Sequence, residues 1–277
     1  MRRPLFGKIT IVGVGLLGGS IGMAVKRLNL SKEVCGYFRN HKKIAQAKRY
    51  GAIDTGTNRF AAAVEHSDLI ILCSPVEDIK TKLGALKRLG MTKPLITDVG
   101  STKAEIIRAA KGLNFVGSHP LAGSEQSGVS HSRPDLFKGS TCIVILDQAP
   151  RSSVRTVCRF WKTLGCRVVT FSALKHDTAL AFTSHLPHAV AFALAAVMPD
   201  HCERFAAGGL KDTTRIALSH PEVWSDILLS NRTNVLKSLD AFERSLKRLK
   251  SAVAAKNRKT LKKLLVCSRN KRRRILS

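Results

Sequence analysis

A histidine at the end of a predicted strand is the residue of this sequence best placed to do chemistry. Residues 115–139 read FVGSHPLAGSEQSGVSHSRPDLFKG, so His119 follows a short apolar run and precedes a loop rich in glycine and serine. A strand end that delivers an imidazole into a polar loop is a common way to place a general base beside a ligand. We therefore predict proton transfer at His119, with residues 124–128 at the rim of the cleft.

Ser101 lies in a second loop of this kind, in the segment DVGSTK at residues 98–103. Loops that follow parallel strands meet at one edge of the sheet, so the Ser101 hydroxyl could reach the same cleft. The alternative is that Ser101 caps a helix that begins near Thr102. The residues alone leave both interpretations open.

Two polar pairs further along the chain have helical spacing. His185 and His188, in SHLPH, would share a helical face and suggest a polar pocket, although either could be structural. Asp212 and Arg215, in GGLKDTTR, could form an anion clamp at a helix start, and a surface ion pair is the alternative. We predict that Trp224, in PEVW, packs against other side chains and does not contact a ligand.

A glycine-rich turn near the N-terminus predicts a dinucleotide site. Residues 8–12 are an apolar, β-rich run, and the sequence GVGLLGG follows at once and leads into a helical pattern. In such a turn the first glycine permits the bend, the second lets the backbone approach a pyrophosphate, and the third lets helix and strand pack closely. The predicted cofactor contacts are Gly13, Gly15, Leu16, Leu17 and Gly18, with Arg39, Ser74 and Pro75 from later strand ends.

The residues after the second predicted strand, at 33–37, bear on the choice of cofactor. Proteins that bind NAD usually carry an acid about 20 residues past the glycines, where it binds the ribose hydroxyls. This sequence has Phe38, Arg39 and Asn40 there, with Lys42 and Lys43 nearby. Because no carboxylate would repel a ribose phosphate and Arg39 could pair with one, the pattern favours NADP and leaves NAD possible.

The predicted elements indicate an α/β fold with two domains. Strand-like runs at residues 69–73, 94–97, 114–116, 141–146 and 166–169 alternate with amphipathic segments at 76–89 and 102–110. This alternation predicts a mainly parallel sheet that is covered on both faces. Beyond it we predict helices only, at 176–198 with a break near Pro187, at 223–249 and at 246–266. We therefore predict a Rossmann-type domain at residues 1–170 and an all-helical substrate and dimerisation domain with a basic tail at 171–277.

Composition bounds the class of protein. The 277 residues are 44% hydrophobic, the longest membrane-span candidate is the short run at 189–198, and no apolar region follows the two N-terminal arginines, so we expect a cytoplasmic protein without a membrane span. The seven cysteines show no CxxC pair, and we expect free thiols and no metal site. The net charge is +28, and from Arg244 onward there are fourteen Lys and Arg and no Asp or Glu. Such a tail could bind nucleic acid or an anionic membrane, but a solvated basic helix is the interpretation we favour.

Several motifs taken together resemble a known family. VGVGLLGGSIG, CSPV, TDVGSTK, VGSHPLAGSEQSG, SHLPHAVAFAL and GGLKDTTRIA followed by PEVW, in this order, resemble the prephenate/arogenate dehydrogenases of tyrosine biosynthesis. The resemblance runs from Ile9 to about Leu249. It implies an oxidative decarboxylation with hydride transfer to NAD or NADP, in a homodimer formed through the helical half. It does not distinguish prephenate from arogenate as substrate.

The resemblance also implies roles for the residues singled out above. His119 matches the histidine that accepts the proton of the C4 hydroxyl group, and Ser101 matches the serine that hydrogen-bonds the same hydroxyl. Arg215 matches the arginine that holds a substrate carboxylate, and His188 matches a histidine of the substrate pocket. Two further residues, His185 and Asp212, would support that pocket.

Two other functions stay open on the sequence. A relative of the β-hydroxyacid dehydrogenases would share the two-domain layout, but such enzymes usually rely on a lysine in the helical half, and the GSHP and SHLPH motifs argue against it. A Rossmann-fold protein that binds nucleotides or nucleic acid through the basic tail is an alternative from another class. Salt-dependent binding of RNA or DNA, lost on truncation after Leu249, would distinguish it.

Overall fold

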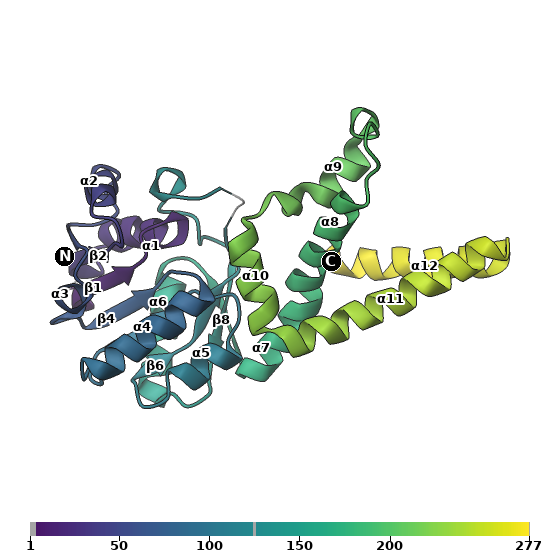
Figure 1. The fold of residues 1–277 in the computed structure, drawn as a ribbon. Helices are drawn as coiled ribbons and strands as arrows, with labels where there is room; N and C mark the ends of the chain where they lie inside the picture. The colour runs from purple at the N-terminus through teal and green to yellow at the C-terminus, as the bar shows by residue number, and fades with distance from the viewer. Residues whose placement is uncertain (1–3, 124–125, 277) are drawn as a thin grey trace. The chain divides into compact units, whose positions relative to one another are not determined.

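The computed structural model describes residues 4–123 and 126–276, which form two compact units (Figure 1). The first unit extends through Asn231 and the second begins at Arg232. The first holds every strand of the described chain and the helices up to α10, and the second consists of α11 and α12.

A six-stranded parallel sheet forms the centre of the first unit. Its strand order is β3-β2-β1-β4-β5-β6, and every pair is parallel. The strands are β1 Phe6–Val12, β2 Ser31–Tyr37, β3 Thr55–Thr57, β4 Leu69–Leu72, β5 Leu95–Asp98 and β6 Phe115–Val116. The connecting helices are α1 Leu16–Arg27, α2 Lys42–Arg49, α3 Phe60–Val64, α4 Val76–Arg88 and α5 Ala104–Ala109, and α6 Arg151–Thr163 follows further along the chain. The predicted α/β class is confirmed.

Apolar side chains cover both faces of this sheet. In β4, Leu69 and Ile71 belong to one buried cluster, whereas Ile70 and Leu72 belong to another. Because successive strand side chains point to opposite faces, a strand that is apolar at every position must be buried on both sides. This explains why the short run LIIL identified the strand correctly from sequence.

A second, three-stranded sheet corrects the prediction of one continuous sheet. It has the order β7-β8-β9, with β7 Ser118–Pro120 antiparallel to β8 Thr141–Ile145, and β8 parallel to β9 Arg167–Phe171. His119 therefore lies within a short strand, opposite Ile143, and not in a loop past a strand end. Apolar runs look alike whichever sheet they join, so the sequence did not separate the two sheets.

The helical part of the first unit differs from the prediction at Pro187. The chain runs through α7 Ala173–Leu180, a π-helical turn Ala181–His185 and α8 Leu186–Ala196, so no break occurs at Pro187, which lies in the first turn of α8. Proline has no N–H to donate, and it is tolerated in the first turn because no intrahelical hydrogen bond needs a donor there. The 3-10 turn Glu203–Phe205, α9 Gly208–Thr214, the 3-10 turn Arg215–Leu218 and α10 Pro221–Ser230 complete the unit. The predicted helix at 223–249 is interrupted at the buried Asn231.

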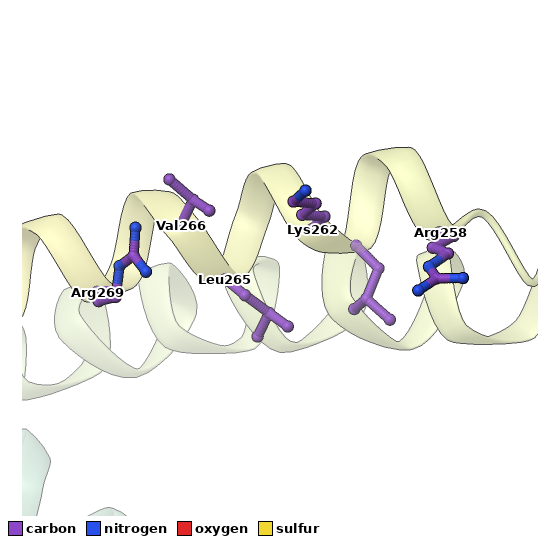
Figure 2. Close-up of a pocket in the computed structure, with 6 residues that line it drawn as sticks. Arg258, Lys262, Leu265, Val266 and Arg269 are labelled. Atoms are coloured by element: carbon purple, nitrogen blue, oxygen red, sulfur yellow. The ribbon is translucent and has the colours of Figure 1, made fainter.

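The second unit is a pair of helices, α11 Arg232–Ala254 and α12 Arg258–Leu276, that pack against each other. The predicted helix at 246–266 is wrong in its middle, because Lys256 has φ +48° and the chain turns there. An open hollow of about 440 Å³ lies on α12 and is lined by Arg258, Leu261, Lys262, Leu265, Val266 and Arg269, as Figure 2 shows. The basic tail is thus helical along most of its length.

One helical stretch, Ala173–Ala196, is long and apolar enough to cross a membrane by length and composition, which the sequence reading missed. Only 22% of its apolar window is buried within the chain. The stretch also carries His176, Asp177 and His185, which are buried in hydrogen-bonded contacts with other parts of the first unit. Such polar groups are costly in lipid, and one apolar helix of this kind is weak evidence for a membrane span.

Candidate active site

A cavity of about 640 Å³ lies at the carboxyl edge of the parallel sheet. It is lined by the loops after β1, β2 and β4, which is where dinucleotides bind in open sheets of this strand order. Of the predicted cofactor contacts it includes Gly13, Gly15, Arg39, Ser74 and Pro75. The lining does not include the other three predicted contacts, Leu16, Leu17 and Gly18.

The three glycines of the turn have different reasons to be glycine. Gly13 has φ +94°, and a Cβ there would lie 2.7 Å from the Cys73 carbonyl oxygen. A Cβ on Gly18 would lie 2.1 Å from the Gly13 carbonyl oxygen, whereas a Cβ on Gly15 would meet nothing within 4 Å. Gly15 is therefore the glycine with open space for a pyrophosphate beside it, and Gly18 serves close packing.

This difference leads to a prediction for two alanine variants. Gly18→Ala forces the turn apart, and we expect it to lower the free energy of unfolding by about 1–3 kcal/mol, as overpacking does. Gly15→Ala should fold with nearly normal stability but bind NAD and NADP more weakly, because the methyl group enters the cofactor space. Thermal denaturation and fluorescence titration with each cofactor measure the two effects. Equal loss of stability in both variants would contradict this assignment.

Polar residues after β2 and β4 also line the cavity, and they could bind the polar groups of a nucleotide. Arg39, Asn40, Lys43 and Gln46 line it past the end of β2, and Phe38 is buried in the core. The hydroxyl oxygen of Ser74 is buried and has no hydrogen-bond partner among the described residues. A buried hydroxyl without a partner is unfavourable, so a ligand group in this cavity would satisfy it.

The order of the strands places the remaining candidates beyond the cavity. Along the sheet edge the loops follow the order Arg39 after β2, Gly15 after β1, Ser74 after β4 and Ser101 after β5, and His119 follows β6. The described lining of the cavity contains neither Ser101 nor His119. Along this edge Arg39 therefore comes first and the glycine turn second. Ser101 and His119, which are predicted to contact the substrate hydroxyl group, come last.

The half-buried His119 is linked to two buried polar side chains. Its Nδ1 lies 2.9 Å from Nε2 of His176, and Nδ1 of His176 lies 2.7 Å from a carboxylate oxygen of Asp177. Burial, followed by the charges of His176, Lys103 and His185, holds the pKa of His119 well below its usual value. His119 is therefore a neutral imidazole at pH 7, as a general base must be.

A second polar group, beneath His119, fixes β7. Asp98 and Lys103 form an ion pair in which both side chains are fully buried. The Lys103 ammonium also donates to the Ser118 carbonyl 2.9 Å away, and Asp98 accepts from the Ser118 N–H at 3.0 Å. The Trp161 indole donates to the Ser118 hydroxyl at 2.9 Å. The backbone beside His119 is thus held by charge-assisted hydrogen bonds.

Ser101 does not cap a helix in the structure. Helix α5 begins at Ala104 with Lys103 as its N-cap, so Ser101 lies two residues before the cap. The N–H groups of Lys103 and Ala104 donate to the Asp177 carboxylate, each at 2.8 Å. The capping interpretation is wrong, because Asp177 satisfies these donors. The half-buried Ser101 remains the residue predicted to contact substrate.

The two histidines of SHLPH both contact one tryptophan, Trp224. The ring of His188 stacks on Trp224 at a centroid distance of 3.5 Å, and His185 meets the same ring edge-on at 6.2 Å. Burial lowers the pKa of His185 to about 4, and its Nε2 has no partner among the described residues. Trp224 therefore packs against other side chains, as predicted, and these are the two histidines of the predicted substrate pocket. The π-helical turn that ends at His185 is a feature often found at functional sites.

Arg215 lies near this group, because its charge, after burial, contributes to the lowered pKa of His188. The predicted clamp at a helix start is wrong in its placement, since α9 begins at Gly208, Arg215 is its C-cap residue and Asp212 lies in its last turn. The Asp212 side chain is exposed. A helix N-terminus therefore does not assist anion binding at this pair.

The residues of the site that the sequence did not single out include Lys103, His176, Asp177 and His220. His220, just before α10, lines the dinucleotide cavity. The signal for the dipeptide His176–Asp177 was weak, because neither residue has a partner at helical spacing. Of the predicted rim, Ser127 and Gly128 line the cavity, whereas Ser124 and Glu125 lie outside the described residues.

A parallel sheet with a glycine-turn cavity, followed by a helical region that carries imidazoles and an arginine, defines a two-domain dehydrogenase that uses a dinucleotide. Residues 21–170 match the nucleotide-binding domain of prephenate dehydrogenase, and residues 172–266 match the dimerization domain of prephenate dehydrogenase. The chain belongs to the prephenate/arogenate dehydrogenase family. The predictions of family, fold class and enzyme class are confirmed.

Individual relatives are similar over most of the chain. Prephenate dehydrogenase of Bacillus subtilis is 33% identical over 91% of this chain and 72% of its own length, and cyclohexadienyl dehydrogenase of Zymomonas mobilis is 32% identical over 91% and 90%. The solved structure of prephenate dehydrogenase from A. aeolicus in complex with hydroxyphenyl propionate and NAD+ matches with a TM-score of 0.91 at 34% identity, over 97% of this chain and 98% of that chain. Synechocystis arogenate dehydrogenase matches with a TM-score of 0.81 at 25% identity, over 97% and 99%.

Proposed function

We propose that this enzyme oxidises and decarboxylates prephenate or arogenate at the carboxyl edge of its parallel sheet, with His119 as the general base. The observation that carries the proposal is the position of the half-buried, neutral His119 beyond the dinucleotide cavity along that edge. The substrate C4 hydroxyl group would donate its proton to His119 as the C4 carbonyl forms. Loss of carbon dioxide from C1 would then give the aromatic ring.

Ser101 supports the same step from the neighbouring loop. Its side chain is half-buried after β5, and its hydroxyl would hydrogen-bond the C4 hydroxyl group and orient it toward His119. Positioning of this kind acts by holding the reacting atoms in line. Its removal should therefore cost less activity than removal of the base.

The substrate carboxylates would be bound by the group around Trp224. Arg215 would hold one carboxylate and His188 would line the pocket, with His185 and Asp212 in supporting roles. The Nε2 atom of His185, which is buried without a described partner, gives this pocket an atom that a ligand or a water molecule would satisfy.

The cofactor residues present in the cavity fit a dinucleotide, with the pyrophosphate beside Gly15 and the adenosine ribose beside Arg39. The bound nicotinamide would supply the hydride acceptor of the reaction. We propose NADP as the preferred cofactor, because Arg39 and Lys43 line the cavity and Phe38 brings no carboxylate to the ribose. Asp78, another lining residue, is the acid that counts against this preference.

The cofactor proposal makes a prediction for Arg39→Ala. The variant loses a cation that could pair with a ribose phosphate, so KM for NADP should rise about 10- to 100-fold, the equivalent of roughly 1.5–3 kcal/mol for a charged hydrogen bond. KM for NAD should hardly change. Initial rates with both cofactors measure this, and Lys48→Ala is a matched control at an exposed helix position outside the cavity lining. A parallel rise in both KM values would contradict the preference.

Four further features belong to the proposal. The functional boundary lies near residue 170, between a Rossmann-type half and a helical half, and the enzyme is a homodimer formed through the helical half. The match to a dimerization domain and the exposed apolar side chains of Leu174, Phe182 and Val197 support this dimer. A cytoplasmic location and a solvated basic tail stay predictions.

A four-way assay tests the function directly. The absorbance of reduced nicotinamide is followed with prephenate and with arogenate, each with NAD and with NADP. Turnover of at least one substrate is expected, and the comparison identifies the substrate and the cofactor together. Absence of turnover with both substrates and both cofactors would refute the proposal.

A further inference from the structure

The side chain of His176 connects His119 to the buried carboxylate of Asp177, in the helical region. The links are the 2.9 Å contact between His119 and His176 and the 2.7 Å contact between His176 and Asp177. His176 is fully buried and Asp177 is 1% exposed, so bulk water does not compete for these contacts. The three residues come from β7 and α7 of the same compact unit.

The direction of these hydrogen bonds follows from the carboxylate. Burial would raise the pKa of Asp177, but hydrogen bonds from His176 and from the N–H groups of Ala104 and Lys103 outweigh burial and lower it. Asp177 is therefore ionised and can only accept, so the Nδ1–H of His176 must donate to it. Burial also lowers the pKa of His176, which is accordingly neutral and has its lone pair on Nε2.

The same reasoning fixes the ring of His119. Nε2 of His176 has no proton to donate, so Nδ1 of His119 must carry the proton of the 2.9 Å hydrogen bond. The lone pair of neutral His119 is then on Nε2, at the other end of the ring. The charged and titratable groups around the two imidazoles, Lys103, Asp98 and His185, do not offer an alternative hydrogen-bond acceptor for Nδ1 in the described contacts.

We propose that His176 and Asp177 are positioning residues that hold His119 in the Nδ1–H tautomer, which makes Nε2 the atom that accepts the proton of the substrate hydroxyl group. This inference rests on the proposed function. The proton leaves the C4 oxygen for Nε2, the C4 hydride leaves with its electron pair for the dinucleotide, and the positive charge on His119 is stabilised through His176 by Asp177. No proton has to move beyond His119.

Asp177 has a second contact that ties this arrangement to Ser101. Its two carboxylate oxygens accept the N–H groups of Lys103 and Ala104, at the end of the loop that carries Ser101. The Asp177 carbonyl in turn accepts from the Asn231 side chain at 2.7 Å. One carboxylate therefore sets the position of the Ser101 loop and the tautomer of His119.

The decisive experiment reads the tautomer directly, by NMR of the full-length protein labelled with 15N in its histidine rings. The His119 signals are assigned by their loss in His119→Asn. We expect a protonated Nδ1 and an unprotonated Nε2 at pH 7.5. A protonated Nε2 in the unaltered protein would overturn the proposal.

Two variants of His176 connect the tautomer to catalysis. His176→Phe keeps the ring shape but removes the acceptor, so kcat should fall on the order of 10²-fold through misplacement of the base, with KM and cofactor binding unchanged. His176→Gln offers an amide oxygen to the Nδ1–H of His119 and should recover most of kcat and the NMR pattern. The control is His66→Gln, at an exposed side chain.

The outcomes separate this inference from the function on which it rests. If the Phe and Gln variants lose the same activity, or only thermal stability, His176 is a packing residue and the proposal is wrong. If the unaltered enzyme turns over neither prephenate nor arogenate while His119 shows the expected tautomer, the proposed function fails and the tautomer assignment stands.

Discussion

His119→Asn is expected to lower kcat about 10²- to 10⁴-fold, which is the contribution that a general base usually makes. Asparagine keeps a polar side chain in β7 but has no nitrogen that can take up a proton at neutral pH. The cofactor cavity should be unaffected, because its described lining does not include His119. Steady-state rates with the preferred substrate, together with cofactor titration, measure the two effects separately.

The pH dependence of the unaltered enzyme offers a second measurement of the same residue. The pKa of His119 lies well below 6.5, chiefly because of burial. The base is therefore already unprotonated at pH 7, and kcat/KM should be lost only as the pH falls through this lowered value. In His119→Asn the residual rate should lack this acid limb.

The control is His66→Asn, because the side chain of His66 is 87% exposed and should not affect catalysis. A His119→Asn enzyme with normal kcat would rule out His119 as the base. An unaltered enzyme whose kcat/KM falls below a pKa near 6.5 or above would show that the environment of His119 in solution is different.

The sequence predicted the fold well where local pattern and tertiary structure agree. The run LIIL at residues 69–72 is buried on both faces, and in the turn GVGLLGG the structure leaves no room for a Cβ at Gly13 or Gly18. Each of these signals is contained within a few consecutive residues of the chain. The ordering of Arg39, Gly15 and Ser74 along one edge followed because parallel strands place successive loops together.

Features that depend on distant contacts were not predictable in this way. His119 lies in a strand that the sequence did not predict, because residues 118–120 pair with residues 142–144, more than 20 residues away. The cap of α5 comes from Asp177, which is over 70 residues from Lys103 and Ala104 in sequence. Ser101 was a possible cap because only its neighbours in sequence were considered. The carboxylate that accepts these hydrogen bonds belongs to a different helix, α7.

Lys103 is the strongest example, and its replacement is expected to give the largest loss of stability. In sequence it is one lysine among many in a strongly basic chain, yet its side chain is fully buried with that of Asp98. Lys103→Met keeps the length and apolar stem but leaves the Asp98 carboxylate buried without its cation. Breaking a buried pair in this way costs roughly 3–5 kcal/mol.

Urea denaturation measures this loss, and Lys80→Met provides the matched control. Lys80 is paired with Glu77 and Glu105 at 2.6 and 2.7 Å, which are good distances, but its side chain is 27% exposed. Water and salt screen such a pair, so its loss should cost about 1 kcal/mol or less. If the two variants lose equal stability, burial does not determine the importance of Lys103.

The double variant Asp98→Asn/Lys103→Met separates the lost charge from the lost packing. The neutral amide removes the buried carboxylate charge, so the double variant should be more stable than Lys103→Met alone. With Asp98→Asn measured as well, the two single variants and the double variant give the coupling energy of the pair. Activity adds a further distinction, because Asp98 and Lys103 both hold the backbone of Ser118, next to the base. A double variant that regains stability but not kcat would show that this buried pair positions His119 as well as stabilising the fold.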